Sequence, residues 1–183
     1  MSSYFVQAGS FLISTLVGFY IILVILRFLL QVIRADFYNP FSQFIVKVTN
    51  PPLMPLRRLI PGVYGLDMSS LALAYLLQVA ELLLLSLLKG VGVPIILLFW
   101  VAIGELVSLI LYIYLFAIII QAVISWINPG NYNPISALIH QLTEPVLRPA
   151  RNMLPPFSGI DFSPLLVIIV INLLIMMLPH IFH

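Results

Sequence analysis

The segments Asn39–Leu71 (NPFSQFIVKVTNPPLMPLRRLIPGVYGLDMSSL) and Asn133–Leu165 (NPISALIHQLTEPVLRPARNMLPPFSGIDFSPL) are two versions of one template, and they decide the fold. They align without a gap at an offset of 94 residues. Many matched positions carry the same Asn, Pro, Ser, Thr, Arg, Gly or Asp, which chance does not produce over so short a stretch. The chain is therefore built from a duplicated unit, and the sequence around each copy defines that unit.

Long apolar windows flank both copies of the template. The chain is 62% hydrophobic and only 8% charged, whereas a soluble domain is about half apolar and about a quarter charged. Three windows have the length of about 20 residues that a helix needs to cross a bilayer: Phe11–Ile33, Ser69–Leu88 and Ser163–Phe182. No Lys or Arg precedes the first window, so we expect a retained span and not a cleaved signal peptide.

The fourth window, Pro94–Ile127, has an unusual length. Its 34 residues would make one helix of about 51 Å, which is longer than an upright span. The window is also too short for two spans and a turn. We expect Pro94–Gly104 to lie in the interface or project outward, with a break at Gly104 and a span from Glu105 to Ile127.

These features predict an all-α membrane protein with four transmembrane helices in one domain, residues 1–183. The repeats are 11–89 and 105–183, joined by a linker at 90–104. Each repeat contains two spans, so the copies insert the same way up as parallel repeats. Both template copies then lie on one side, where most Lys and Arg residues of the loops gather, and such residues stay in the cytoplasm. We expect the bacterial inner membrane, with cytoplasmic template loops and both termini in the periplasm.

The template itself has three parts. Its start is amphipathic, with Phe41, Phe44, Ile45 and Val48 at helical spacing, and it predicts a short helix in the headgroup layer. Its middle carries repeated prolines, which we expect to fix turns. Its end predicts a helix N-terminus, with serine as the N-cap residue and an aspartate just before it. The predicted cap residues are Asp67, Ser69, Asp161 and Ser163.

Charged residues of the template form a second prediction, which we call the basic platform. Its members are Arg57, Arg58, Glu144, Arg148 and Arg151. Guanidinium groups hold phosphate or carboxylate, so the platform is a candidate site for a protein partner or an anionic lipid headgroup. The plainer interpretation is retention of these loops in the cytoplasm together with general headgroup contact.

Polar residues inside the spans are candidates for function. Arg27 and Gln78 each lie about 13 Å from the cytoplasmic edge of their helices, and Glu81 is one turn deeper. We therefore expect an Arg27–Gln78–Glu81 cluster. The second repeat has Gln121 and Asn172 at the positions of Arg27 and Gln78. Helix–helix hydrogen bonding explains these residues, and an ion or proton route is the alternative.

Several classes of function are disfavoured by the sequence. The chain has no Cys, which excludes disulfides and thiolate chemistry. Its three His residues lack the further ligands of a metal site, and no enzyme motif is present. A net charge of +2 gives no indication of direct nucleic-acid binding. We therefore expect no enzyme activity, no cofactor and no bound metal.

The duplicated layout and the motifs SWINPG, PLRRLIP and EPVLRPARNMLPPFSGIDFSPL closely resemble the YggT family of bacterial membrane proteins. The first template copy departs from the last motif, with Asn50, Met54 and Ser70 in place of Glu, Arg and Pro. The resemblance implies an inner-membrane protein linked to osmotic tolerance and potassium uptake, and it supplies no catalytic residue. We expect a non-enzymatic scaffold or assembly factor that contacts other membrane proteins or itself. The alternative is an ion transport component or channel subunit for potassium.

Overall fold

The computed structural model describes residues 3–63, 65–127, 133–153 and 161–182. Within these ranges the chain is helical throughout its regular structure. The helices are α1 (Ser3–Val32), α2 (Pro40–Leu59), α3 (Met68–Lys89), α4 (Ile95–Ile127), α5 (Pro134–Met153) and α6 (Ser163–Phe182). Helices α1, α3, α4 and α6 are long and apolar enough to cross a membrane. The predicted all-α fold with four membrane-spanning helices is confirmed.

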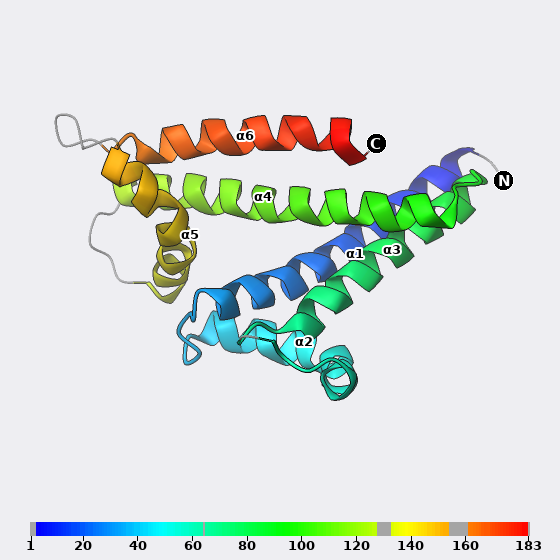
Figure 1. Ribbon diagram of the computed structural model, residues 1–183, viewed down its shortest axis with the longest axis horizontal. Coiled ribbons are helices and arrows are strands. Elements are labelled where there is room, and N and C mark those ends of the chain that lie inside the picture. Colours follow the sequence, from blue (N-terminus) through cyan, green and yellow to red (C-terminus); the bar gives the residue numbers. More distant parts are fainter. Residues whose placement is uncertain (1–2, 64, 128–132, 154–160, 183) are drawn as a thin grey trace.

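The four long helices form two hairpins (Figure 1). Helix α1 packs on α3, and α4 packs on α6. The hairpins touch through α3 and α4, while the shorter helices α2 and α5 contact one another at the opposite end of the molecule from the two termini. The repeats are therefore parallel, as the duplicated template predicts.

The interior of each hairpin is anchored to its short helix by an equivalent leucine. Leu53 of α2 and Leu147 of α5 are separated by the repeat offset, and both are almost fully buried. Leu53 belongs to a core with Ile21 and Val24 of α1, and Leu147 belongs to a core with Ile118 of α4. Burying such a side chain stabilises the packing by about 2 kcal/mol. Each of the two short helices, α2 and α5, which we call the interfacial helices, is thus packed stably on its own hairpin.

The predicted break at Gly104 is wrong, because α4 is one continuous helix of 33 residues. Gly104 has a packing role instead. A Cβ atom at this position would lie 2.6 Å from Cγ of Phe182, so the glycine allows the end of α6 to approach α4. The Trp100 indole supports the same contact, with its ring centroid 5.0 Å from that of Phe182.

The prediction that the template prolines fix turns is wrong for positions 51, 55, 145 and 149. Pro61 lies beyond the end of α2, and Pro155 lies outside the described residues. Helix α2 continues through Pro51, Pro52 and Pro55, and α5 continues through Pro145 and Pro149. A proline inside a helix leaves the carbonyl four residues earlier without its usual N–H donor. Pro52 removes the donor for the Val48 carbonyl, and the Tyr20 hydroxyl of α1 donates to that oxygen at 3.3 Å. Neighbouring helices thus replace part of the lost hydrogen bonding.

Candidate functional site

A threonine clamp connects each interfacial helix to its hairpin. In the first repeat, Nη1 of Arg27 donates to the Thr49 hydroxyl at 2.8 Å, and this hydroxyl donates to the Ile45 carbonyl at 2.7 Å. In the second repeat, the Thr143 hydroxyl hydrogen-bonds with Oε1 of Gln121. Both threonines are fully buried. Arg27 and Gln121 therefore do occupy equivalent places, and each holds the short helix of its own repeat.

An ion pair closes the end of the first template copy. Asp67 is the N-cap residue of α3, where its side chain accepts hydrogen bonds from the backbone N–H and the hydroxyl of Ser70. Arg57 at the end of α2 donates to the same carboxylate, and Nε of Arg27 lies 3.9 Å from it. Burial raises the pKa of Asp67, but the hydrogen bonds from Arg57 and Ser70 outweigh it and hold the pKa below its ordinary value.

The second copy repeats this arrangement with an additional carboxylate. Nε of Arg151 donates to Asp161 at 2.9 Å, and Nη1 donates to Glu144 at 2.6 Å. Burial lowers the pKa of Arg151, but the two carboxylates outweigh it and raise the pKa above its ordinary value. The pKa of Asp161 is raised by burial and lowered more strongly by hydrogen bonds from Ser163 and Arg151, so it lies below its ordinary value.

The serines predicted as N-cap residues have other contacts. Ser69 lies inside α3, and its buried hydroxyl donates to the carbonyl of Ile60 at 2.7 Å. Asp67 caps the helix itself, because a carboxylate accepts from the helix N–H groups more strongly than a hydroxyl does. Ser163 is the first residue of α6, and its N–H donates to Asp161 at 2.9 Å. The aspartates were therefore correctly placed at helix starts, and the serine cap of α3 was wrong.

The predicted Arg27–Gln78–Glu81 cluster is wrong for Arg27, which turns toward α2 and Asp67. Gln78 and Glu81 do meet, with Nε2 of Gln78 donating to Glu81 at 3.4 Å in the buried part of α3. Asn172 in α6 is exposed and donates to the carbonyl of Ile168 in its own helix. Arg27 and Gln78 lie at similar depths in α1 and α3, but side chains at equal depth need not point toward each other.

The basic platform separates into two groups of residues. Arg57, Arg151 and Glu144 are engaged in ion pairs within the protein. Arg58 and Arg148 are exposed, and their side chains form no hydrogen bond or ion pair with any other described residue. Arg58 and Arg148 are thus the platform arginines that make no such contact within the described part of the chain.

The two template copies also contact one another, which single-residue patterns did not predict. The side chain of Asn39 caps α2 by accepting from the N–H of Phe41, and its amide donates to the carbonyl of Pro134 at 2.7 Å. Gln141 of α5 accepts from the N–H of Asp36 at 3.3 Å. Identity across the repeats was the available signal for Asn39, since Asn133 matches it, and no such signal marked Gln141.

The chain has two hairpins of membrane-spanning helices. Each hairpin is closed by its short helix and by an Arg–Asp ion pair, so the fold is that of a duplicated multi-pass membrane protein. The family model for CCB3/YggT matches residues 6–88 and 100–182, one match for each repeat. The chain belongs to this family.

Relatives of similar length occur in several bacteria. An uncharacterized protein of Pseudomonas aeruginosa is 45% identical, covering 93% of this chain and 87% of its own length. A protein encoded in the proC 3′ region of Vibrio alginolyticus is 44% identical, over 87% of both chains. The uncharacterized protein YggT of Escherichia coli K12 is 40% identical, over 88% of this chain and 84% of its own. No solved structure matches this chain.

Proposed function

We propose that this protein is a non-enzymatic scaffold of the bacterial inner membrane, with α2 and α5 as its cytoplasmic docking surface. The observation that carries the proposal is the state of the template arginines. Arg57 and Arg151 hold the two helices by ion pairs, whereas Arg58 and Arg148 are exposed and make no ion pair with a described residue. A surface whose guanidinium groups are not paired with described residues suits recognition of an acidic protein segment.

The orientation of the scaffold follows from its loop charges. Arg34, Lys47, Arg58 and Arg148 lie on the side of α2 and α5, and Lys89 ends the helix on the other side. Lys and Arg residues in short loops favour the cytoplasmic side. Both termini are then periplasmic. The family resemblance adds a link to osmotic tolerance, which the scaffold would serve by assembling other envelope proteins.

Chemical cross-linking in membranes tests the proposal. Partners joined to the wild-type protein should be lost from an Arg58→Ala/Arg148→Ala variant, because exposed charges contribute to recognition and little to folding. A Lys89→Ala variant is the matched control on the opposite side. Unchanged cross-linking in the double variant, with normal protein levels, would exclude this surface as the docking site.

Ion transport is the second candidate, and the buried Gln78–Glu81 pair in α3 favours it. A carboxylate within a membrane-spanning helix commonly serves an ion or proton path. Potassium flux into liposomes should then be strong with the wild-type protein and weak with Glu81→Gln, which keeps the side-chain size. Flux that is absent from folded wild-type protein would leave the scaffold as the remaining function.

A further inference from the structure

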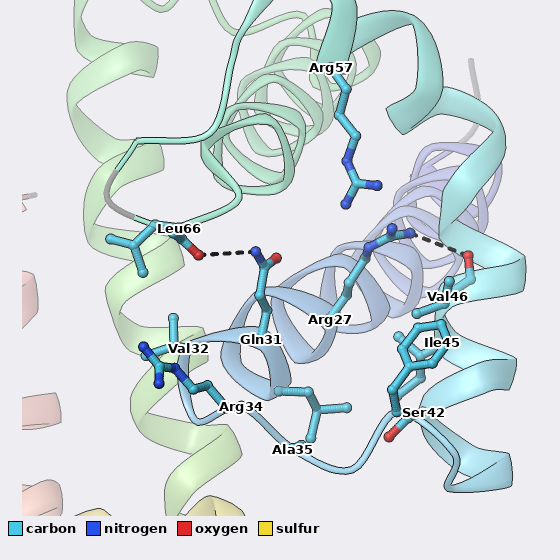
Figure 2. A pocket seen from close by; sticks show the side chains of 13 residues that line it. Arg27, Gln31, Val32, Arg34, Ala35, Ser42, Ile45, Val46, Arg57 and Leu66 are labelled. Carbon is cyan, nitrogen blue, oxygen red and sulfur yellow. Dashed lines mark hydrogen bonds between the residues drawn. The ribbon is translucent and has the colours of Figure 1, made fainter.

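A cavity lies between α1, α2 and the segment that leads into α3, and neither Arg58 nor Arg148 is among its lining residues (Figure 2). Its volume is about 550 Å³, which is within the usual range of small-molecule sites. Arg27 and Gln31 enter it from one face of α1, and Arg57 enters it from α2. The guanidinium groups of Arg27 and Arg57 point toward one another across the space, and Arg34 stands at the rim.

Positive charge in this cavity exceeds negative charge. Three arginines line it, and no described carboxylate is among its lining residues. Asp67 lies beside the cavity and binds both Arg27 and Arg57, so one carboxylate serves two guanidinium groups. Arg34 forms no hydrogen bond or ion pair through its side chain with any other described residue. Closely spaced guanidinium groups with too few carboxylates are arranged to receive an anion.

A buried serine hydroxyl also belongs to the wall of this cavity. Ser42 lines the cavity and is 5% exposed, yet its hydroxyl has no hydrogen-bond partner among the described residues. Buried polar groups are normally paired. The matching Ser136 of the second repeat does have a partner, since it donates to the carbonyl of Asn133 at 2.7 Å. The two repeats therefore differ at this serine, because only the second uses the hydroxyl in a hydrogen bond with a described residue.

The backbone at Arg34 is a further peculiarity of this cavity. Arg34 follows α1 with a φ of 52°, in the left-handed region that glycine adopts without strain. The N–H of Arg34 bonds to Gln31 and that of Ala35 to Leu30, as in a helix C-terminus that usually carries glycine there. An arginine with this backbone conformation makes the folded protein less stable than a glycine would. We therefore expect the Arg34 side chain to bring a compensating benefit.

The second repeat lacks the same excess of charge. In the sequence, Gln121 stands at the position of Arg27, Asn128 at that of Arg34, and Glu144 at that of Asn50. Two positive charges of the first repeat are thus replaced by amides, and a carboxylate is added. As a result Arg151 is held by two carboxylates, whereas Arg57 shares one. The cationic cavity is a feature of the first repeat.

We infer that the cavity between α1 and α2 binds a phosphate group, held by Arg27 and Arg57 with Gln31 and Arg34 at its entrance. Guanidinium groups match phosphate oxygens in pairs. The phosphate belongs to a lipid headgroup or to a soluble phosphate. A neighbouring apolar cavity of about 540 Å³ shares Leu30 and Ile45 as walls, which favours the lipid. This inference does not depend on the proposed docking of a protein partner.

The test uses the full-length protein in nanodiscs of phosphatidylcholine with or without phosphatidylglycerol. The variant is Gln31→Leu/Arg34→Gly, because both side chains are exposed and glycine suits the backbone at position 34. Arg58→Gln removes one charge from the same side outside the cavity and is the control. Native mass spectrometry measures retained lipid, and thermal unfolding in phosphatidylcholine alone measures stabilisation by inorganic phosphate.

For a lipid headgroup, the wild-type protein and Arg58→Gln retain phosphatidylglycerol, and the double variant retains about tenfold less, as expected for loss of a charge-assisted hydrogen bond. For a soluble phosphate, no such lipid is retained, and inorganic phosphate raises the Tm of the wild-type protein and the control but not of the double variant. The inference is overturned if neither ligand binds, or if the double variant and the control behave alike.

Discussion

Asp67 and Asp161 occupy equivalent positions in the two repeats, but we expect them to contribute unequally to the free energy of unfolding because their surroundings differ. The Asp67 side chain is 5% exposed and forms ion pairs with two arginines, whereas that of Asp161 is 39% exposed and shares one arginine with Glu144. Asp67→Asn should therefore lower the free energy of unfolding by about 3 kcal/mol, because it leaves buried positive charge unpaired. Asp161→Asn should lower it by about 1 kcal/mol or less, as for an exposed pair.

Unfolding of the purified protein by denaturant in detergent micelles would measure both losses. Glu144→Gln is the additional control, since it removes a carboxylate and leaves Asp161 on Arg151. Equal losses for the two aspartate variants would contradict the unequal burial of these carboxylates. The comparison therefore tests the contacts and not merely the sequence identity of the repeats.

The Asp67 carboxylate also makes the stability of the protein depend on pH. The pKa of Asp67 in the folded protein lies below its ordinary value, whereas in the unfolded chain it lies near about 3.9. Its contribution to stability is therefore fully present well above that value and is lost as pH falls through the folded pKa. The Tm of the wild-type protein should fall more steeply below about pH 4 than that of Asp67→Asn. Parallel curves would show that the Asp67 carboxylate does not contribute to this acid lability.

At the scale of elements, the prolines of α2 account for a difference between two equivalent tyrosines. Tyr20 donates to the Val48 carbonyl, which Pro52 leaves without a helix donor. Tyr114 is its repeat equivalent, but residue 146 is valine, so no carbonyl is released there. Tyr20→Phe should lower the free energy of unfolding by about 1 kcal/mol, and Tyr114→Phe should have a smaller effect. A larger loss at Tyr114 would contradict the compensation of Pro52 by Tyr20.

Close packing of α4 on α6 depends on Gly104. A Cβ there would lie 2.6 Å from Cγ and 2.7 Å from Cβ of Phe182, so Gly104→Ala should lower the free energy of unfolding by about 1 to 3 kcal/mol. Phe182→Gly removes every atom that the new methyl would meet. In a double-mutant cycle the two changes should therefore be far from additive. Additive losses would mean that Gly104 matters for a reason other than this contact.

Helix positions followed from the sequence because apolar length and period are local properties. Predictions of a residue's role from the sequence are wrong where that role depends on a residue distant in the chain but near in space. Gly104 was expected to break a helix, but its effect is on Phe182 of another helix. The template prolines are expected to fix turns, but α2 continues through Pro51 and Pro55. Tyr20 of α1 supplies the donor that Pro52 lacks. Equal depth predicts that Arg27 faces Gln78, but depth does not specify which way a side chain points around its helix.

At the scale of the whole molecule, the repeats share a frame but differ in charge. They meet through α3 with α4 and through α2 with α5, and an apolar cavity lies between α1 and α4 behind the interfacial helices. The first repeat places Arg27 and Arg57 on one carboxylate, whereas the second surrounds Arg151 with two. Duplication thus supplied the architecture, and divergence at a few positions made one copy cationic.

Orientation in the membrane is the prediction that belongs to this scale, and the absence of cysteine makes it directly testable. Arg58→Cys places a thiol at the end of α2, and Lys89→Cys places one at the end of α3, on the other side of the membrane. Since Lys and Arg favour the cytoplasmic side, a membrane-impermeant maleimide added to intact spheroplasts should label Lys89→Cys and not Arg58→Cys. In inverted vesicles the labelling should be reversed. The opposite pattern would place α2 and α5 in the periplasm, and both the docking surface and the phosphate cavity would then face partners and ligands of that compartment.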